Sequence, residues 1–451
     1  MERKDVAFSG KIGYVLAAAG SAVGLGNIWR FPYLAAKQGG GIFIITYILL
    51  VLFVGYFLAL TETAIGRKTG KSTLDAFKSL APKWGWVGIV PAIVPIIILP
   101  YYSVVGGWVV KYFSSFATGN LSSTLNSEFF GNFISSPIQP LICFSLFFIA
   151  TGVIVSFGVE KGIEKASRIM MPILVLLCVI IAGYTLTLDG ALEGVKYLFI
   201  PNFSQFSLKT LFSAMSQMFY SLSIAMGILV TYGSYMKKDV ALDKAVKQVA
   251  IFDTGIAILA AMMVVPGVFA FSGGDLDALN KGAGLMFITL PKVFDSFKGG
   301  AFIGTLFFIL VLFAALTSAI SLMEAIVNEL QDRTKLNRHQ ACFWICLYGI
   351  VVGCLVSLGF GPLKMIQIIG FSLFDFCDFI SNSVLMPIAA ILICLFTAFV
   401  IKPKTLIDEI DLSSQFKLSK VYTVVITYIA PIVICLVFIT SVMEGLGILK
   451  Y

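Results

Sequence analysis

The chain has 451 residues, of which 59% are hydrophobic and only 12% charged, and its mean hydropathy is +0.96. These values exclude a soluble globular domain and are typical of a protein that crosses a membrane many times. The net charge of +8 therefore does not indicate nucleic-acid binding, and the expected surroundings are a lipid bilayer.

Apolar runs of about 20 residues, the length that crosses a bilayer, predict eleven transmembrane helices in one domain, residues 1–451. The predicted spans are 12–36, 41–66, 86–116, 138–158, 166–188, 209–235, 242–271, 299–330, 338–359, 365–400 and 420–446. Lysine and arginine are concentrated in alternate loops. By the positive-inside rule the N-terminus is expected in the cytoplasm and, because the number of spans is odd, the C-terminus outside the cell membrane.

The first span contains three glycines, an asparagine, an arginine and a proline between Gly20 and Tyr33. Such residues weaken a helix, yet in lipid every backbone polar group must find a partner inside the protein. We therefore expect the helix of the first span to be interrupted here, with the freed backbone groups facing a bound ion and solute.

Five spans lie in residues 12–188 and five in 209–400, with helix 420–446 left over. Because five is odd, two copies of such a unit would be inverted, which is typical of secondary transporters with broken helices at matching places. The sixth span should then break as the first does, near Ser221 and Ser223. The alternative is an ordinary helix, in which these hydroxyls bond to their own turn.

Four motifs resemble the neurotransmitter:sodium symporter family, in its bacterial amino-acid transporter branch with eleven helices. They are Gly20 to Pro32, Glu62-Thr63-Ala64-Ile65-Gly66-Arg67, Tyr220 to Gly227, and Leu316-Thr317-Ser318. The resemblance implies an all-α polytopic membrane protein of the LeuT-type fold, an inverted five-plus-five repeat with one additional C-terminal helix, whose first and sixth helices unwind at the midplane. It implies sodium-coupled symport by alternating access, and no enzyme activity.

The resemblance implies two sodium sites. Ligands of one would be the carbonyls of Gly20, Val23 and Ala314 and the hydroxyls of Thr317 and Ser318. The alternative for both hydroxyls is a bond to a carbonyl one turn earlier.

The other sodium would be bound by the Ala22 carbonyl, Asn27, Ser221 and Asp253. Here aspartate replaces the asparagine of the best-known bacterial member. A carboxylate inside a membrane is costly unless it is paired, so Asp253 is a functional candidate. In the chloride-dependent animal members an anion near this site balances the cations. We expect Asp253 to supply that charge itself and to take up a proton when the site empties, so that transport requires no chloride. Tyr47, Gln217 and Ser221 match other positions of the family's chloride site.

The family's substrate carboxylate would meet the NH groups of Leu25 and Gly26 and the Tyr102 hydroxyl. Amine carriers have an aspartate at the position of Gly24, so glycine favours an amino acid. The ammonium would meet the carbonyls of Ala22, Tyr220 and Ser221 and the Ser223 hydroxyl. The side-chain pocket would comprise Ile98, Tyr102, Tyr220, Ser223, Met226, Ser318 and Leu322, which suits leucine, methionine, tyrosine or tryptophan.

Gates are also implied by the resemblance. On the outside, Arg30 would pair with Asp378 or, one turn earlier, Asp375, and Tyr102 and Tyr220 would cover the substrate.

On the inside, Asp332 and Tyr235 match a gate whose basic partner is Arg3 or Lys4, and Phe8 stands where the family has tryptophan. Glu62 matches a buried glutamate that braces the sixth helix.

Three other function classes are compatible with some of these features. A channel also uses broken helices and midplane polar groups, and a sensor would bind the solute without carrying it. An enzyme would need a nucleophile, base and orienting group in one place, and no such set is visible. The sequence leaves the preferred amino acid, ion stoichiometry, proton countertransport and homodimer formation open.

Overall fold

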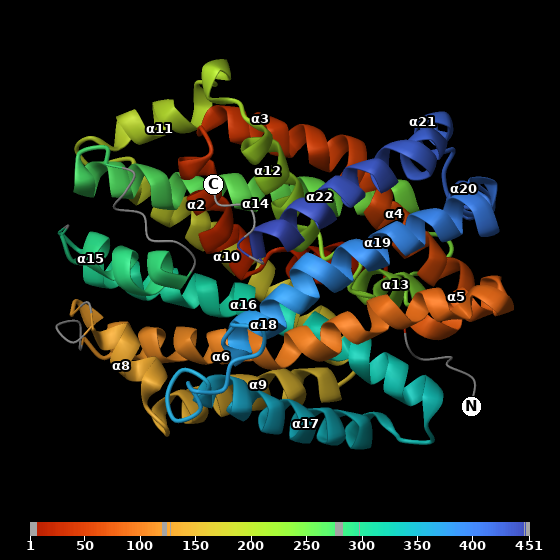
Figure 1. Ribbon diagram of the computed structural model, residues 1–451, viewed down its shortest axis with the longest axis horizontal. Helices are drawn as coiled ribbons and strands as arrows, with labels where there is room; N and C mark the ends of the chain where they lie inside the picture. Colours follow the sequence, from red (N-terminus) through yellow and green to blue (C-terminus); the bar gives the residue numbers. More distant parts are fainter. Residues whose placement is uncertain are drawn as a thin grey trace.

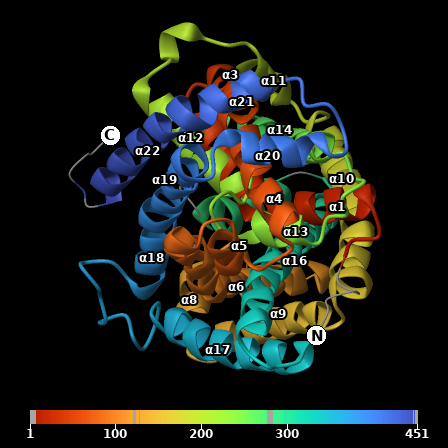
Figure 2. The same ribbon diagram turned by 90° about the vertical axis from the view of Figure 1, so that its right-hand side faces the viewer.

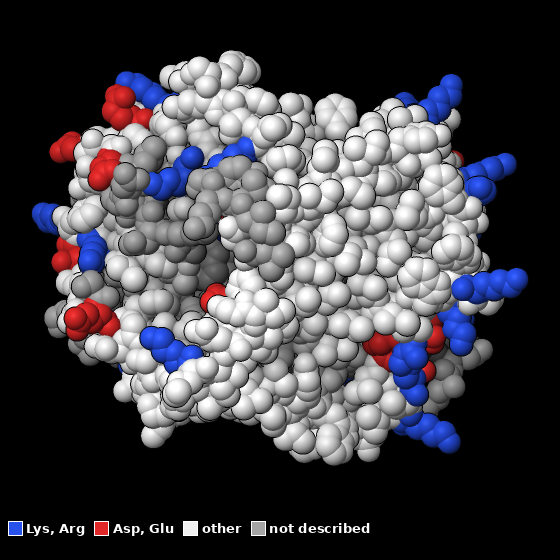
Figure 3. Space-filling view, in the orientation of Figure 1, with Lys and Arg blue, Asp and Glu red and all other residues white. Residues whose placement is uncertain are grey.

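The computed structural model describes residues 7–119, 124–126, 128–275, 283–296, 298–445 and 447. These residues are almost entirely helical, and the only β-type pairs among them are two isolated bridges. Many of the long helices lie along the longest axis of the molecule (Figure 1). Charged side chains gather at its two ends and leave a broad band between them nearly free of charge (Figure 3). This band is the surface that lipid tails require.

Nine helices in the described part of the chain are long and apolar enough to cross a membrane. The second to fifth spans are Gly41–Thr69 (α3, Gly41–Leu50; η2, Val51–Gly55; α4, Tyr56–Thr69), Pro82–Ala117 (η3, Pro82–Gly88; α6, Ile89–Ala117), Gln139–Ser156 (α9) and Val159–Thr185 (η4, Val159–Glu164; α10, Lys165–Thr185). The seventh to eleventh are Leu242–Ser272 (α14), Gly300–Arg333 (α16), Arg338–Leu358 (α17), Leu373–Val400 (α18, Leu373–Asp378; η8, Phe379–Leu385; α19, Met386–Leu395; η9, Phe396–Val400) and Ser419–Gly445 (α21, Ser419–Val424; η10, Val425–Ile429; α22, Ala430–Gly445). Shorter connecting helices are α5 (Thr73–Leu80), α8 (Phe129–Ser135), α11 (Ala191–Phe199), η7 (Leu285–Thr289) with α15 (Leu290–Asp295), and α20 (Pro403–Asp411).

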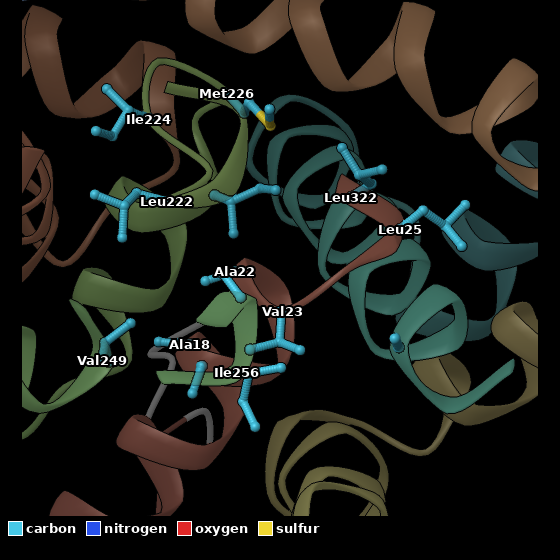
Figure 4. Packing of buried hydrophobic residues seen from close by; sticks show 14 of the residues in the cluster. Ala18, Ala22, Val23, Leu25, Leu222, Ile224, Met226, Val249, Ile256 and Leu322 are labelled. Atoms are coloured by element: carbon cyan, nitrogen blue, oxygen red, sulfur yellow. The ribbon is translucent and has the colours of Figure 1, made fainter. Parts of the chain in front are cut away.

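The first span is broken, as predicted. Helix α1 (Lys11–Ala22) and the segment Gly26–Lys37 (η1, Gly26–Arg30; α2, Phe31–Lys37) meet at an angle of 56°. Val23 between them is extended, with φ −73° and ψ 99°. Figure 4 shows this thin stretch of chain between Val23 and Leu25, beside the helix that carries Leu322.

The sixth span is also broken, so the alternative of an ordinary helix is wrong. Helices α12 (Leu208–Ser221) and α13 (Ile228–Ser234) are separated by residues 222–227. Three of these residues are left-handed: Ser223 at φ 54°, Ala225 at φ 64° and Gly227 at φ 69°. A left-handed residue cannot continue a right-handed helix.

Two predicted spans have different bounds. The fifth begins at Val159, not 166, and its first part carries Glu164, which is buried and paired with Arg168 at 2.6 Å. The tenth begins at Leu373, not 365. Ile369 at φ 53° and the following glycine turn the chain before it, outside the helix.

Helix α4 packs directly against α13. A methyl group added at Gly66 or Gly233 would meet the main chain of the other helix. Small residues allow such close approach in membrane proteins. The end of the molecule that carries α20 faces the viewer in Figure 2. There, buried Arg67 bonds to Glu409 of α20 at 2.9 Å, and Lys238 bonds to the same carboxylate at 2.7 Å.

Candidate functional site

The two helix breaks face each other across a small cavity of about 30 Å³. Its lining residues are Ser21, Ala22, Gly24, Leu25, Gly26, Asn27, Ile98, Tyr102, Tyr220, Ser223, Met226, Ile228, Ser318 and Leu322. The structure thus brings together eleven of the twelve predicted substrate residues. Ser221 lies outside the lining and bonds to Asp253. In Figure 4, Met226, Leu322 and Leu25 gather beside the break in the first helix.

One side of the cavity is polar and lies at Gly24. A Cβ atom there would stand 2.7 Å from the Ser318 hydroxyl oxygen and 3.1 Å from that of Tyr102. The same Tyr102 hydroxyl accepts from the Leu25 NH at 3.4 Å. Helical NH groups next to a break attract anions, because they lack carbonyl partners in their own helix. This corner therefore offers groups that can bind a carboxylate, and a side chain at position 24 would collide with Ser318 and Tyr102.

The first predicted cation site lies between α1 and α16. The Ser318 hydroxyl is 3.4 Å from the Gly20 carbonyl oxygen and 3.4 Å from that of Val23. The Thr317 hydroxyl bonds to the carbonyls of Phe313 and Ala314 at 3.0 and 3.2 Å, so Thr317 follows the back-bonding alternative here while Ser318 reaches across to α1. All of these atoms are neutral oxygens, the ligands that hard cations prefer.

The second predicted cation site surrounds buried Asp253 of α14. Asn27 donates to its carboxylate at 2.7 Å, Ser221 contacts both carboxylate oxygens at 2.9 Å, and Tyr47 donates at 3.3 Å. The Asn27 amide oxygen accepts from the Gly24 NH at 3.1 Å. Three donors thus converge on one negative charge beside the cavity, which satisfies a carboxylate that would otherwise be costly in the membrane.

Gln217 joins the same region from α12. Its amide nitrogen donates to the Gly26 carbonyl at 3.1 Å, and its amide oxygen is buried without a partner among the described residues.

Glu62 of α4 holds the break in the sixth helix. Its carboxylate accepts from the Ala225 NH at 2.7 Å, at one of the two left-handed residues other than glycine in that break. A carboxylate that accepts from a backbone NH stabilises the turn, because no helical carbonyl is available to that NH.

Replacing Glu62 with leucine should lower the free energy of unfolding by about 1–3 kcal/mol, because the buried Ala225 NH loses its acceptor. Glu62→Gln keeps an acceptor oxygen and should lower it by less than half as much. Thermal unfolding of both variants in detergent checks this. Equal stability of the two variants would show that the contact does not brace the break.

Outside the small cavity lies a larger one of about 400 Å³, which we call the outer cavity. It is lined by Leu25, Trp29, Arg30, Tyr33, Leu34, Tyr101, Tyr102, Val105, Lys209, Phe212, Ser213, Ser216, Tyr220, Ala283, Phe374, Asp378, Asn382, Ser383, Thr440, Ser441 and Glu444. Tyr102 and Tyr220 line both cavities and so stand between them.

Arg30 donates to Ser216 at 2.8 Å and lies over the ring of Tyr220, 5.6 Å from its centre. Asp378 lines the outer cavity with Arg30, but it accepts from Asn382 at 2.7 Å. Asp375 instead bonds to Ser372, the residue that caps its own helix, and is absent from the lining of the outer cavity. Of the two predicted partners, only Asp378 therefore shares a space with Arg30.

The inner end holds the other predicted gate residues. Asp332 accepts from the Ser72 NH at 2.9 Å. Tyr235 donates to Glu324 at 2.7 Å, and Glu324 forms an ion pair with Arg338. Their predicted partners, Arg3 or Lys4, lie outside the described residues.

Several residues of these sites were not predicted from the sequence. Ser21 and Ile228 line the cavity directly beside predicted residues. Glu324 could have been found, because it is a carboxylate within the apolar eighth span.

Phe8 packs edge-on against Tyr14, Tyr232 and Tyr235, with ring centres 5.5–6.1 Å apart.

Comparison with known proteins agrees with this architecture. The model of the "Sodium:neurotransmitter symporter family" matches residues 5–132 and 134–450. The sodium-dependent transporter YhdH of Bacillus subtilis (strain 168) is 35% identical over 460 residues, which cover 100% of both chains. A sodium-dependent transporter of Haemophilus influenzae is 31% identical over 451 residues, 96% of this chain and 97% of the relative.

Among solved structures, the chain is similar to MhsT in complex with L-phenylalanine. The TM-score is 0.87 and the sequence identity 39%, over 97% of this chain and 99% of the other. The fold predicted from the sequence is thereby confirmed, whereas the repeat boundaries 12–188 and 209–400 stay a prediction. The chain belongs to the sodium:neurotransmitter symporter family and is a sodium-dependent, multi-pass membrane symporter.

Proposed function

We propose that this symporter takes up a neutral, apolar or aromatic L-amino acid with two sodium ions, by alternating access and without chloride. The observation that carries the proposal is the polar corner at Gly24, where a side chain would collide with Ser318 and Tyr102. We infer that the substrate carboxylate accepts from the polar groups of this corner and completes the shell of a cation bound nearby. Substrate and ion would then bind cooperatively, because each supplies an interaction that the other needs.

The rest of the cavity favours an uncharged substrate side chain. Ile98, Met226, Ile228 and Leu322 line it, and none of its lining residues carries a charge. A charged group would lose its water there without gaining a partner. The similarity to a transporter solved with L-phenylalanine supports an aromatic or aliphatic amino acid.

The two sodium ions are assigned from the oxygen sets described above. One would lie between Gly20, Val23, Ala314, Thr317 and Ser318, and the other between Ala22, Asn27, Ser221 and Asp253. We infer that no chloride is needed, because the carboxylate of Asp253 supplies a negative charge that offsets one cation.

Alternating access requires closure on both sides of the cavity. On the outside we assign this role to Tyr220, with Arg30 above it and Asp378 across the outer cavity. On the inside we assign it to Tyr235 and Asp332. We take the end with α5 and α20 as cytoplasmic, in agreement with the positive-inside rule.

Uptake into proteoliposomes tests the proposal. Labelled L-leucine, L-phenylalanine and L-tryptophan are supplied with an inward sodium gradient or with potassium instead, and all natural amino acids compete. We expect saturable, sodium-dependent uptake that apolar and aromatic amino acids inhibit and that aspartate and lysine do not. Uptake without sodium, or equal inhibition by charged amino acids, would contradict the proposal.

Gly24→Asp should weaken amino-acid binding more than about 100-fold, because a fixed carboxylate would repel that of the substrate within a few ångströms. Gly24→Asn adds nearly the same volume without charge and should weaken it less. The affinity for an amine without a carboxylate, such as 2-phenylethylamine, should rise relative to the affinity for L-phenylalanine only in Gly24→Asp. Competition binding measures both ratios, and equal behaviour of the two variants would show that space alone matters.

A further inference from the structure

Ser21 lines the small cavity at the last turn of α1 and is only 4% exposed. Its carbonyl lies where the helix ends. The NH group four residues later, on Leu25, points to the Tyr102 hydroxyl at 3.4 Å. The carbonyl of Ser21 is therefore available to other donors, as carbonyls in the last turn of a helix are.

Two hydroxyl groups from different helices use this carbonyl. Ser318 of α16 donates to it at 3.1 Å, and Ser223 of the sixth-helix break donates to it at 3.2 Å. The Ser21 hydroxyl is itself 3.2 Å from the Ser223 hydroxyl. Ser21 is thus fixed by α16 and contacts Ser223 with both its main chain and its side chain.

A serine hydroxyl has one proton and two lone pairs. When Ser223 donates its proton to Ser21, either to the hydroxyl or to the carbonyl beside it, only lone pairs remain for a group in the cavity. Lone pairs accept from an ammonium and repel a carboxylate. The polar corner at Gly24, with its NH and hydroxyl groups, has the opposite preference.

We propose that Ser21 is a positioning residue whose hydroxyl orients the Ser223 hydroxyl so that this side of the cavity binds the substrate ammonium. This role of Ser21 rests on the proposed function, since it assumes an amino-acid substrate. Ser21 thereby fixes the direction in which the amino acid lies, with its ammonium at Ser223 and its carboxylate at Gly24. It acts through Ser223 and not by a contact of its own.

A double-mutant cycle on the full-length protein in detergent tests this inference. Binding of labelled L-leucine, L-phenylalanine and L-tryptophan at saturating sodium is measured for Ser21→Ala, Ser21→Thr, Ser223→Ala and the Ser21→Ala/Ser223→Ala double variant. The control is Ser103→Ala, which removes a buried hydroxyl that bonds within its own helix at 2.7 Å.

We expect Ser223→Ala to raise Kd about tenfold or more and Ser21→Ala about fivefold, as for a charge-assisted and a neutral hydrogen bond. Because Ser21 acts through Ser223, the double variant should bind no more weakly than Ser223→Ala alone. Ser21→Thr keeps the hydroxyl and should bind nearly as the unaltered protein does. Ser103→Ala should leave Kd unchanged.

A second readout separates orientation from a general defect. L-leucine and 2-hydroxy-4-methylpentanoate differ only in the ammonium, which a hydroxyl replaces. Ser21→Ala should reduce the preference for leucine about fivefold, whereas a structural defect would weaken both ligands equally. Additive effects in the cycle, or an unchanged preference, would overturn the inference while amino-acid binding by the unaltered protein remained. If the unaltered protein bound none of the three amino acids, the proposed function would fail and the inference with it.

Discussion

Asn27→Ala is expected to abolish sodium-dependent amino-acid binding, with a rise in Kd of more than about 100-fold. Asn27 is fully buried and joins three parts of the site: the Gly24 NH at 3.1 Å, Ser221 at 3.0 Å and Asp253 at 2.7 Å. Alanine removes a proposed sodium ligand and also leaves a buried carboxylate without its shortest hydrogen bond. Each loss amounts to about 1.5–3 kcal/mol for a charged group, and together they exceed 100-fold.

Equilibrium binding over a range of sodium concentrations measures this effect. Sodium should also stabilise the unaltered protein against thermal unfolding, and this stabilisation should be much smaller in Asn27→Ala. Asn328→Ala is the matched control, because Asn328 is buried in α16 and its amide nitrogen has no hydrogen-bond partner in the described part of the chain. Sodium-dependent binding that survived in Asn27→Ala would refute the assignment of the second cation site.

Asp253→Asn is expected to lower uptake at least tenfold in chloride-free buffer and to make the remainder depend on chloride. Uptake by the unaltered protein should be the same in sodium chloride and sodium gluconate. The donors on Ser221 and Tyr47 that converge on the carboxylate would remain in the variant. They could then bind a chloride ion that restores the missing charge.

The comparison of the two salts in proteoliposomes checks this expectation. Glu193→Gln serves as a control, since it removes a carboxylate that is 66% exposed and paired with Lys196 at the surface, where ion pairs contribute little. Chloride-dependent uptake by the unaltered protein would show that Asp253 does not supply the anion's charge. Full activity of Asp253→Asn without chloride would show that no fixed charge is needed there.

The break in the first helix could be predicted because its cause is local. Gly24, Gly26 and Asn27 weaken a helix wherever they stand together in an apolar span. Asp253 could be found for a similar reason, since one carboxylate in a long apolar run is visible without any knowledge of its neighbours. Residue types alone therefore indicated the break and the buried carboxylate, whereas the residues that line the cavity were predicted from the family resemblance.

The break in the sixth helix was a weaker prediction. Ser223 and Ala225 adopt left-handed conformations that their side chains disfavour. The carboxylate that stabilises one of them, Glu62, lies 163 residues away in sequence. Pattern and propensity do not contain such contacts. The bracing role of Glu62 was predicted only from the family resemblance. The pairing of Glu324 with Arg338 and the buried position of Glu164 had no such guide and were missed.

The glycine contact between α4 and α13 limits how the inner side can open. With main chain against main chain at Gly66 and Gly233, a side chain at either position would collide with the other helix. We therefore expect the second half of the sixth helix to move with α4, and α20 to move with them, because Arg67 and Lys238 both bind Glu409. A passage to the cytoplasm would have to form on the other side of α13, by departure of α1.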